Sequence, residues 1–274
     1  GTIGLRQQEA LFQHWRNLPC LLQNLKTMPD HRVIAVAYSH QPTNQTDSYL
    51  PVFTAAASMA QSLAAVLNVP AYSFSHQEGH LAAGRLGAGG PFAPSFLAVH
   101  LSGGTTELLL VQEKPNGFQV SVVGQTLDLN AGQFVDRVGV ALGLPFPAGQ
   151  SLEKLGRSDL TVPQPLIPSY TEGYDISFSG PATAALRLIT QGTNEAAVAR
   201  AVFRCIANSL EKVLRTAVAD VGINDILLVG GVAANGFIRE RLRCRLQHPA
   251  IGARLFFTSP ELSTDNAVGI AHLG

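Results

Sequence analysis

The chain has 274 residues, a length that fits one large domain or two lobes rather than a single small core. Apolar residues make up 46% of it and charged residues 14%, a balance that builds a sizeable buried core and excludes a disordered chain. The 19 basic and 19 acidic side chains cancel. If the protein binds RNA, it must therefore use a local basic patch or a partner protein.

Cysteine usage and hydropathy indicate the compartment. Cys20, Cys205 and Cys244 are odd in number and lie in segments with helical patterns, so a disulfide framework is not expected and a reducing cytosol is favoured. No apolar run reaches the roughly 18 residues of a membrane-spanning helix, and no signal peptide is visible. We therefore expect a cytoplasmic protein with no membrane partner.

The first third of the chain is expected to alternate helices and strands. Apolar residues recur at helical spacing over 8–26, and a wholly apolar run over 33–38 is typical of a strand buried on both faces. Thr54 is placed to cap a helix over 55–67, and a short strand over 71–74 follows. This order predicts a parallel sheet with helices on its faces.

A stretch rich in Gly and Pro, 85–95, is the candidate boundary between two lobes. Residues 144–178 hold five of the 16 prolines and are expected to be irregular. We predict a first lobe over 1–94, with 260–274 packing back toward it, and a second lobe over 95–259. The other predicted elements are strands over 96–101, 106–112 and 117–124 joined by tight turns, a helix over 129–143, a long helix from a Thr193 or Asn194 cap to about 220, a strand over 225–229, a helix over 237–246, a strand over 254–257 and a closing helix.

Two histidines are spaced for a helix face in the segment His76-Gln77-Glu78-Gly79-His80. Side chains four residues apart lie on the same side of a helix, so His76 and His80 could reach one metal ion. Glu78 is the third residue, so the segment is not the H-E-x-x-H motif of zinc peptidases, and Glu78 would point away from that face. Taken alone, the pair could equally be two unrelated histidines at a helix start.

Two glycine pairs follow predicted buried strands. In Leu101-Ser102-Gly103-Gly104-Thr105-Thr106 the glycines allow a sharp turn that presents N–H groups to phosphate oxygens, although an ordinary hairpin turn has the same pattern. Gly230 and Gly231 lie between a strand and a helix, which favours an anion or nucleotide site, and Asn235 can offer amide hydrogen bonds to a ribose or base. The second pattern is not G-x-G-x-x-G, so a dinucleotide-binding fold is not the best match.

The last loop contains Ser263-Thr264-Asp265-Asn266. Asp265 is a hard oxygen ligand that could complete a His-His-Asp metal site with positions left open for substrate or water. The same residue types are also preferred as helix N-caps, and both roles can hold together.

Four arginines alternate along one predicted helix, at 239, 241, 243 and 245. Arg239 and Arg243 share one face, and Arg241 and Arg245 share another. The usual meaning is a solvated helix whose cations lie near its C-terminus, and a patch for RNA is the minority hypothesis.

Six segments occur together and in order, and their combination resembles the TsaD family, also called Gcp or YgjD and formerly described as glycoproteases. This family belongs to the actin–Hsp70–sugar kinase superfamily. The resemblance covers nearly the whole chain and rests on the segments SHQEGHLAAG, LSGGTTELLLV, GQTLDLNAGQFVDRVGVALGLPFPAG, DISFSGPATAAL, LLVGGVAANGFIRERL and STDNAVGIAHLG.

The resemblance implies a two-lobed α/β fold of the actin-like ATPase class, which is ribonuclease H-like. Because the chain starts at the helix that follows the family's opening strand pair, we expect the first lobe to be incomplete. The implied activity is that of a tRNA threonylcarbamoyl transferase. Such an enzyme moves a threonylcarbamoyl group from its adenylate to the exocyclic amine of the adenosine next to the anticodon.

The resemblance also implies the ligands and partners. One divalent metal ion, iron or zinc, would be held by His76, His80 and Asp265, and ATP or threonylcarbamoyl-adenylate would be the nucleotide ligand. No protein nucleophile is assigned, because the base amine can attack directly. The expected partners are tRNA and TsaB-like and TsaE-like subunits, in a homo- or heterodimer. The expected nucleotide-binding residues are Leu101, Ser102, Gly103, Gly104, Thr105, Asp136, Gly149, Gly230, Gly231 and Asn235.

Several positions depart from the family pattern. A polar SHQPTNQTD stretch replaces a glycine-rich loop, Thr105 replaces a histidine, and Gln133 replaces an acidic residue. The turn Pro147-Ala148-Gly149-Gln150 lacks one glycine, and Ser263 and Ala267 flank the last motif. These changes motivate an alternative, a catalytically weak nucleotide-binding paralogue or regulatory subunit. A metalloprotease is a third hypothesis, which the position of Glu78 disfavours.

Overall fold

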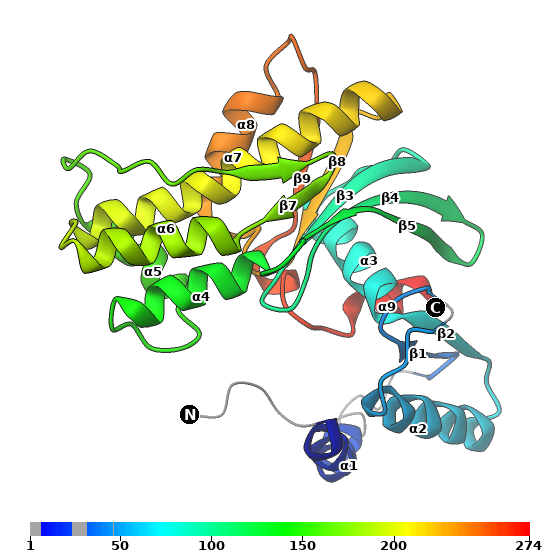
Figure 1. Cartoon of the computed structure of the whole chain (residues 1–274). Helices are drawn as coiled ribbons and strands as arrows, with labels where there is room; N and C mark the ends of the chain where they lie inside the picture. Colours follow the sequence, from blue (N-terminus) through cyan, green and yellow to red (C-terminus); the bar gives the residue numbers. More distant parts are fainter. Residues whose placement is uncertain (1–6, 24–31, 46) are drawn as a thin grey trace. The chain divides into compact units, whose positions relative to one another are not determined.

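The structure, a computed structural model, describes residues 7–23, 32–45 and 47–274. The predicted end of the first helix at residue 26 therefore lies outside the described residues. The chain forms two compact units, whose elements are named in Figure 1. The predicted lobes, 1–94 with 260–274 and 95–259, stay a prediction. The first unit comprises the chain up to residue 83 with 114–119 and 265–274, and the second comprises 84–113 and 120–264.

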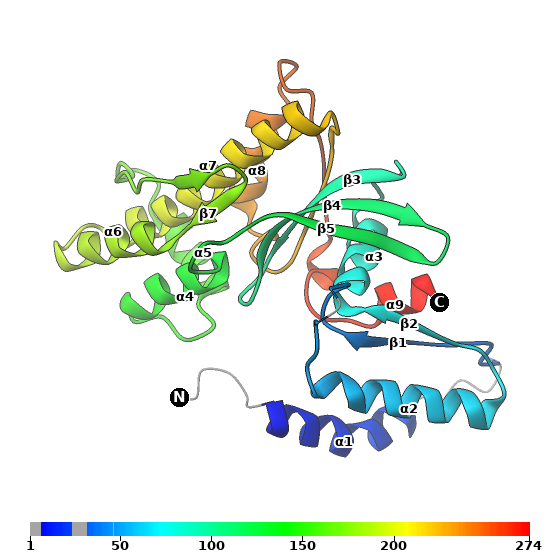
Figure 2. The same cartoon turned by 45° about the vertical axis from the view of Figure 1, so that its right-hand side comes forward.

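The first unit is built on two parallel strands. β1 (Val36–Gln41) pairs with β2 (Ala71–Ser75), and α2 (Val52–Leu67) connects them in a βαβ arrangement. α2 and α9 (Val268–Leu273) both contact β1. α1 (Gln7–Gln23) packs along α2, as Figure 2 shows. The predicted parallel pairing in this region is therefore confirmed.

Two boundaries in the first unit differ from the prediction. β1 begins at Val36 rather than at residue 33, because Pro70 precedes its partner strand and has no N–H to extend the ladder. The pairing starts where the Val36 N–H donates to the Pro70 carbonyl over 3.0 Å. α2 begins at Val52, so Thr54 is not its cap. Thr54 lies inside the first turn, and its hydroxyl donates to the Pro51 carbonyl over 2.6 Å.

The second unit contains a five-stranded sheet in the order β5-β4-β3-β8-β9. β3 (Ser95–Leu101) lies antiparallel to β4 (Thr106–Lys114), which turns back into β5 (Gly117–Gln125). β3 also lies parallel to β8 (Asp225–Val229), and β8 parallel to β9 (Arg254–Phe257). The predicted three-strand meander is therefore one half of a mixed sheet, and β8 and β9 are the other half.

Both faces of the two central strands, β3 and β8, are buried. On one face, β3 and β8 contribute Leu97, Val99 and Leu228 to a core shared with the helices, which gather on one side of the sheet in Figure 1. On the other face, the end of α3 (His76–Ala88) packs so closely that a Cβ on Gly84 would lie 2.4 Å from Val229. The helices of the core are α4 (Ala131–Ala141), α5 (Gly149–Ser158), α6 (Ser179–Thr190), α7 (Glu195–Val221) and α8 (Gly236–Leu246).

The prediction that 144–178 is irregular is wrong in part. The segment contains α5 and a short antiparallel pair, β6 (Tyr170–Glu172) with β7 (Asp175–Ser177). The five prolines lie on either side of α5 and leave its ten residues free of proline, so a helix can form between them. The Gly- and Pro-rich stretch 85–95 is likewise helical as far as Ala88.

The long helix α7 starts as predicted. Its N-cap is Asn194, whose side-chain oxygen accepts the N–H of Ala197 over 3.0 Å. α4 starts with a capping box in which the Gln133 side chain accepts the N–H of Asn130. Glutamine serves in this role as well as glutamate, so the replacement of an acidic residue at 133 leaves the helix start intact.

Within the described ranges, no helix is long and apolar enough to cross a membrane. All three cysteines are free thiols. Cys205 is buried on α7, and desolvation raises the pKa of its thiol to about 12, so this side chain stays protonated and contributes to the core.

Asp128 ties the loop before α4 to the start of α6. Its carboxylate accepts the N–H of Phe178 over 2.8 Å and the hydroxyl of Ser177 over 2.6 Å, and it also accepts the hydroxyl of Ser179. Desolvation raises the pKa of this carboxyl, but the hydrogen bonds from Ser177 and Ser179 outweigh it and hold the pKa well below its usual range. The loop therefore depends on an ionised Asp128.

We expect Asp128→Asn to lower the free energy of unfolding by about 1–2 kcal/mol at neutral pH, because an amide accepts these hydrogen bonds less well. The pKa is depressed in the folded state, so the wild-type advantage is fully present above the ordinary pKa of about 3.9 and shrinks as the pH falls below it. Urea unfolding at neutral pH and near pH 3 measures both values. A difference that is equal at the two pH values would contradict this role.

Candidate functional site

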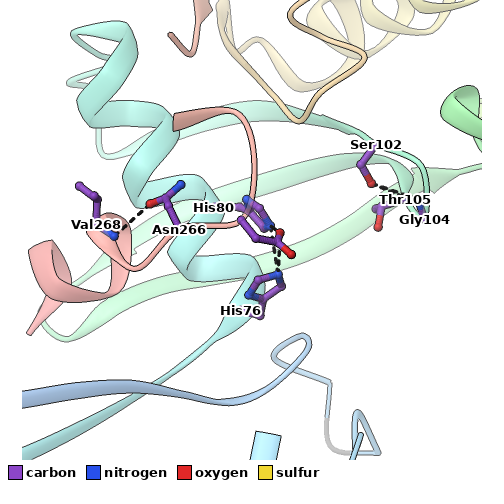
Figure 3. A network of polar contacts seen from close by, with 8 residues as sticks. His76, His80, Ser102, Gly104, Thr105, Asn266 and Val268 are labelled. Atoms are coloured by element: carbon purple, nitrogen blue, oxygen red, sulfur yellow. Dashed lines mark hydrogen bonds and ion pairs between the residues drawn. The ribbon is translucent and has the colours of Figure 1, made fainter. Parts of the chain in front are cut away.

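The first two turns of α3 bring His76 and His80 together. Figure 3 shows both rings extending from this helix toward one another. Their Nε2 atoms are 3.1 Å apart, and the ring centroids are separated by 4.5 Å. His80 is buried at 8% exposure, whereas His76 is partly exposed. The predicted helical spacing therefore places both nitrogens at one point.

Asp265 faces this pair from the loop before α9. One of its carboxylate oxygens lies 3.0 Å from Nε2 of His80 and 3.4 Å from Nε2 of His76. Hydrogen bonds from the two histidines hold the pKa of the Asp265 carboxyl well below its usual range. The helix-cap hypothesis for Asp265 is wrong, because the side-chain oxygen of Asn266 accepts the N–H of Val268 over 3.0 Å instead (Figure 3).

The spacing of these three ligand atoms suits a single metal ion. Ligands about 2.1 Å from a tetrahedral ion lie roughly 3.4 Å from each other. The measured separations of 3.0, 3.1 and 3.4 Å agree with that geometry. Two imidazoles and one carboxylate form a donor set that zinc and ferrous iron both accept, with coordination positions left open.

Two glycines let α9 lie directly on α3. A Cβ on Gly269 would come within 1.9 Å of the Gly79 carbonyl oxygen, and one on Gly79 would come within 2.9 Å of the Ile270 side chain. At 269 only glycine fits, because the contact there is with the backbone of α3. This contact fixes the loop that carries Asp265 beside the turn of α3 that carries the histidines.

Glu78, between the two histidines, is a structural anchor. Its carboxylate accepts the N–H of Ser75 over 2.8 Å, while the Ser75 hydroxyl accepts the N–H of Glu78 over 3.1 Å. This reciprocal pair is a capping box at the start of α3. The other carboxylate oxygen accepts the N–H of Phe118 over 3.0 Å. The sequence signal for this role is the Ser-x-x-Glu spacing of Ser75 and Glu78, which is typical of a capping box.

We expect Glu78→Ala to lower the free energy of unfolding by about 2–4 kcal/mol, because the buried N–H groups of Ser75 and Phe118 lose their acceptor. Glu78→Gln keeps one oxygen and should lose less. Urea denaturation of the three proteins gives the comparison. Equal stability of Glu78→Ala and the wild type would show that this carboxylate does not hold the start of α3.

In the second unit, the two glycine turns lie side by side. β3 and β8 are paired as far as His100 and Val229, so the turns that follow them begin at the same edge of the sheet. Gly230 has φ +95°, and a Cβ there would lie 2.2 Å from the Leu101 carbonyl oxygen. The same oxygen accepts the N–H of Val232 over 3.1 Å.

The turn after β3 is also in contact with the start of α4. The Ser102 carbonyl accepts the N–H of Gly132 over 3.1 Å, and a Cβ on Gly132 would lie 2.6 Å from the Cα of Gly103. Within the turn, the Ser102 hydroxyl accepts the N–H groups of Thr105 over 3.0 Å and of Gly104 over 3.3 Å (Figure 3). Gly103 and Gly104 are exposed at the tip.

Three further predicted nucleotide-binding residues lie on or next to helices: Asp136 on α4, Gly149 at the start of α5 and Asn235 just before α8. The carboxylate of Asp136 on α4 accepts the N–H of Ala148 over 2.7 Å, which holds the turn that leads into Gly149. Asn235 caps α8, since its side-chain oxygen accepts the N–H of Ile238 over 3.0 Å. The Asn235 amide nitrogen is buried and has no acceptor among the described residues, so a donor remains there.

Comparison with known proteins identifies the family. A family model described as TsaD, tRNA N6-adenosine threonylcarbamoyltransferase, matches residues 47–272. The chain belongs to this family. It is 35% identical over 250 residues to the tRNA N6-adenosine threonylcarbamoyltransferase of Symbiobacterium thermophilum, covering 89% of this chain and 70% of that protein. It is 31% identical over 272 residues to the protein of the same name from Archaeoglobus fulgidus, covering 99% and 79%.

Two solved structures with a similar fold are distant from this chain in sequence. A crystal structure of HypF from T. kodakarensis superposes with a TM-score of 0.59 at 15% identity, over 75% of this chain and 36% of that one. Full-length HypF in a phosphate- and nucleotide-bound form gives a TM-score of 0.60 at 14% identity, over 78% and 44%. At this identity the likeness shows a shared mixed α/β fold with a central sheet and nothing about activity.

Proposed function

We propose that this chain transfers a threonylcarbamoyl group from its adenylate to the exocyclic amine of an adenosine in tRNA. The observation that carries the proposal is the match of residues 47–272 to the TsaD family in a chain whose His76, His80 and Asp265 ligand atoms all lie within 4.8 Å of one another. The fold that fits this proposal is the actin-like ATPase fold.

In this proposal the three side chains His76, His80 and Asp265 hold one divalent ion, zinc or iron. When bound, the ion supplies a Lewis acid that polarises oxygen atoms of the donor. The capping box of α3 and the contact between Gly79 and Gly269 hold these ligands in position. The ionised Asp265 adds the negative charge that a divalent cation needs in such a site.

The second unit provides the groups for the nucleotide. The glycine turns after β3 and β8 lie at one edge of the sheet, where α8 also begins. The unpaired amide nitrogen of Asn235 is a donor for the ribose or base. The base amine of the tRNA attacks the carbamoyl carbon, the bond from that carbon to the phosphate oxygen breaks, and AMP leaves. TsaB-like and TsaE-like subunits are the partners that we propose.

A specific observation favours the alternative of a nucleotide-binding paralogue without turnover. The N–H groups of Gly104 and Thr105 donate to the Ser102 hydroxyl, and Asp136 is bonded to the Ala148 N–H. These groups are used inside the protein, whereas catalysis would need them to face the phosphates of the donor. If this turn rearranged when the adenylate donor bound, the N–H groups of Gly104 and Thr105 would be released to face its phosphates. That result would favour the transferase over the paralogue without turnover.

We expect the purified protein to contain a stoichiometric divalent metal ion and His80→Ala to lose at least about 90% of it, because two ligands hold such an ion far less tightly than three. His272→Ala removes an exposed histidine of α9 and should keep the metal. Elemental analysis of the three proteins measures this. Equal metal content in His80→Ala and the wild type would rule the cluster out as the metal site.

We expect the full chain, mixed with partner subunits, tRNA and threonylcarbamoyl-adenylate, to form threonylcarbamoyl-adenosine, detected by mass spectrometry of the digested tRNA. The His80→Ala protein should form at least about tenfold less, because the donor loses its Lewis acid. Absence of the modified nucleoside with the wild type would refute the transferase. Calorimetric binding of the adenylate in that case would favour the paralogue without turnover.

A further inference from the structure

A surface cavity in the second unit is lined by three arginines. It has a volume of about 430 Å³ and lies where residues 160–164 meet α7 and α8. Arg200 and Arg204 come from α7, and Arg241 comes from α8 with the aromatic ring of Phe237. Among the described residues, no acidic side chain lines the cavity. None of the predicted metal or nucleotide residues is part of it.

Arg204 lacks an acidic partner among the described residues. Its Nε atom is buried and has no hydrogen-bond acceptor among the described residues, and no ion pair of those residues includes Arg204. A buried donor without an acceptor is destabilising, because it has lost its hydrogen bonds to water and gained none in the protein. Arg200 lies one turn away on the same helix face, where two like charges repel. Two arginines kept together at this cost indicate that an anion supplies the missing acceptor.

The other two arginines are held in position by the protein. The guanidinium of Arg200 donates to the carbonyls of Gly156 over 3.1 Å and Val162 over 2.6 Å, which fixes the segment that forms the cavity rim. Carbonyls carry no formal charge, and the nearby Asp159 carboxylate, whose pKa is lowered by hydrogen bonds from Thr161 and in part by the charge of Arg200, offsets some of this positive charge. Arg241 donates to Asn208 over 2.8 Å. Glu211 lies 3.9 Å from Arg241 but pairs more closely with Arg245, at 2.8 Å. The cavity therefore keeps an excess of positive charge.

We propose that this cavity binds a backbone phosphate of the tRNA substrate, with an adjoining base stacked on Phe237. The inference rests on the proposed function, because it takes tRNA as the RNA. A single phosphate is much smaller than 430 Å³, and the exposed rim, with Leu160 at 72% exposure, lets a strand enter and leave. Arginine forks match phosphate oxygens, and aromatic rings stack on unpaired bases. A chain of zero net charge must bind RNA through such a local group.

The test is Arg204→Gln in the full chain, with fluorescence anisotropy of labelled tRNA over a series of salt concentrations. Losing one phosphate contact should weaken binding roughly tenfold and lower the slope of log K against log salt by about 0.7–0.9. Arg187→Gln is the matched control, because Arg187 is an exposed arginine of α6 that does not line the cavity. It should bind like the wild type. Since the buried Nε of Arg204 has no acceptor among the described residues, Arg204→Gln should melt at or above the wild-type temperature.

Four results decide the matter. Wild-type tRNA affinity in Arg204→Gln, or equal weakening in Arg187→Gln, overturns the inference. The third result comes from titrating the wild type and Arg204→Gln with inorganic phosphate and with AMP. If either binds the wild type but not Arg204→Gln while tRNA binding is unchanged, the cavity holds a small anion and the RNA proposal is wrong. The fourth is a specific loss of tRNA binding in Arg204→Gln while the wild type makes no modified nucleoside. It leaves this inference standing and removes the proposed transferase.

Discussion

The buried carboxylate of Glu78 is the interaction on which the first unit depends. A buried charge is tolerated only when it is hydrogen-bonded, and Glu78 receives the N–H groups of Ser75 and Phe118. The first of these bonds fixes where α3 begins, and therefore where His76 and His80 lie on its surface. A glutamate between two histidines would ordinarily raise the question of a general base. Here it is bound to the backbone, which favours a metal site that binds and orients a ligand over a peptidase.

Close backbone contact through glycine is the second constraint, and it acts in both units. Gly269 allows α9 to touch α3, and Gly230 allows the turn after β8 to touch the carbonyl of Leu101. In each case a Cβ would lie about as close as a covalent neighbour, so packing excludes any other residue. Both contacts hold loops that carry candidate ligands, Asp265 before α9 and Asn235 before α8.

The sequence predicted well whatever depends on local pattern. The buried strands β3 and β8, the cap at Asn194 and the helical spacing of His76 and His80 follow from periodicity and side-chain chemistry, and the structure has all of them. The prediction that 33–38 is a strand buried on both faces is wrong, because β1 begins at Val36 and none of its residues is fully buried. α5 was missed because five prolines in the segment suggested irregular chain, although none lies inside the helix. The Thr54 cap was wrong because the helix had already begun at Val52. The spacing of residues in the sequence does not say which polar residue of the last loop, 263–266, faces His76 and His80. That depends on how α9 packs against α3.

The arginines show why residue type and spacing do not settle a site. The four arginines of α8 suggested a solvated face or an RNA patch, and they have different roles. Arg239 donates to the carbonyls of Ala233 and Thr258, and Arg245 pairs with Glu211. Only Arg241 lines the cavity, and its companions there come from α7, far away in sequence. A cation is available to a ligand when the fold leaves it without a partner. Such pairing is set by helix contacts, so among the described residues of the cavity the arginine with a buried, unpaired donor is Arg204, which no periodic pattern on α8 could indicate.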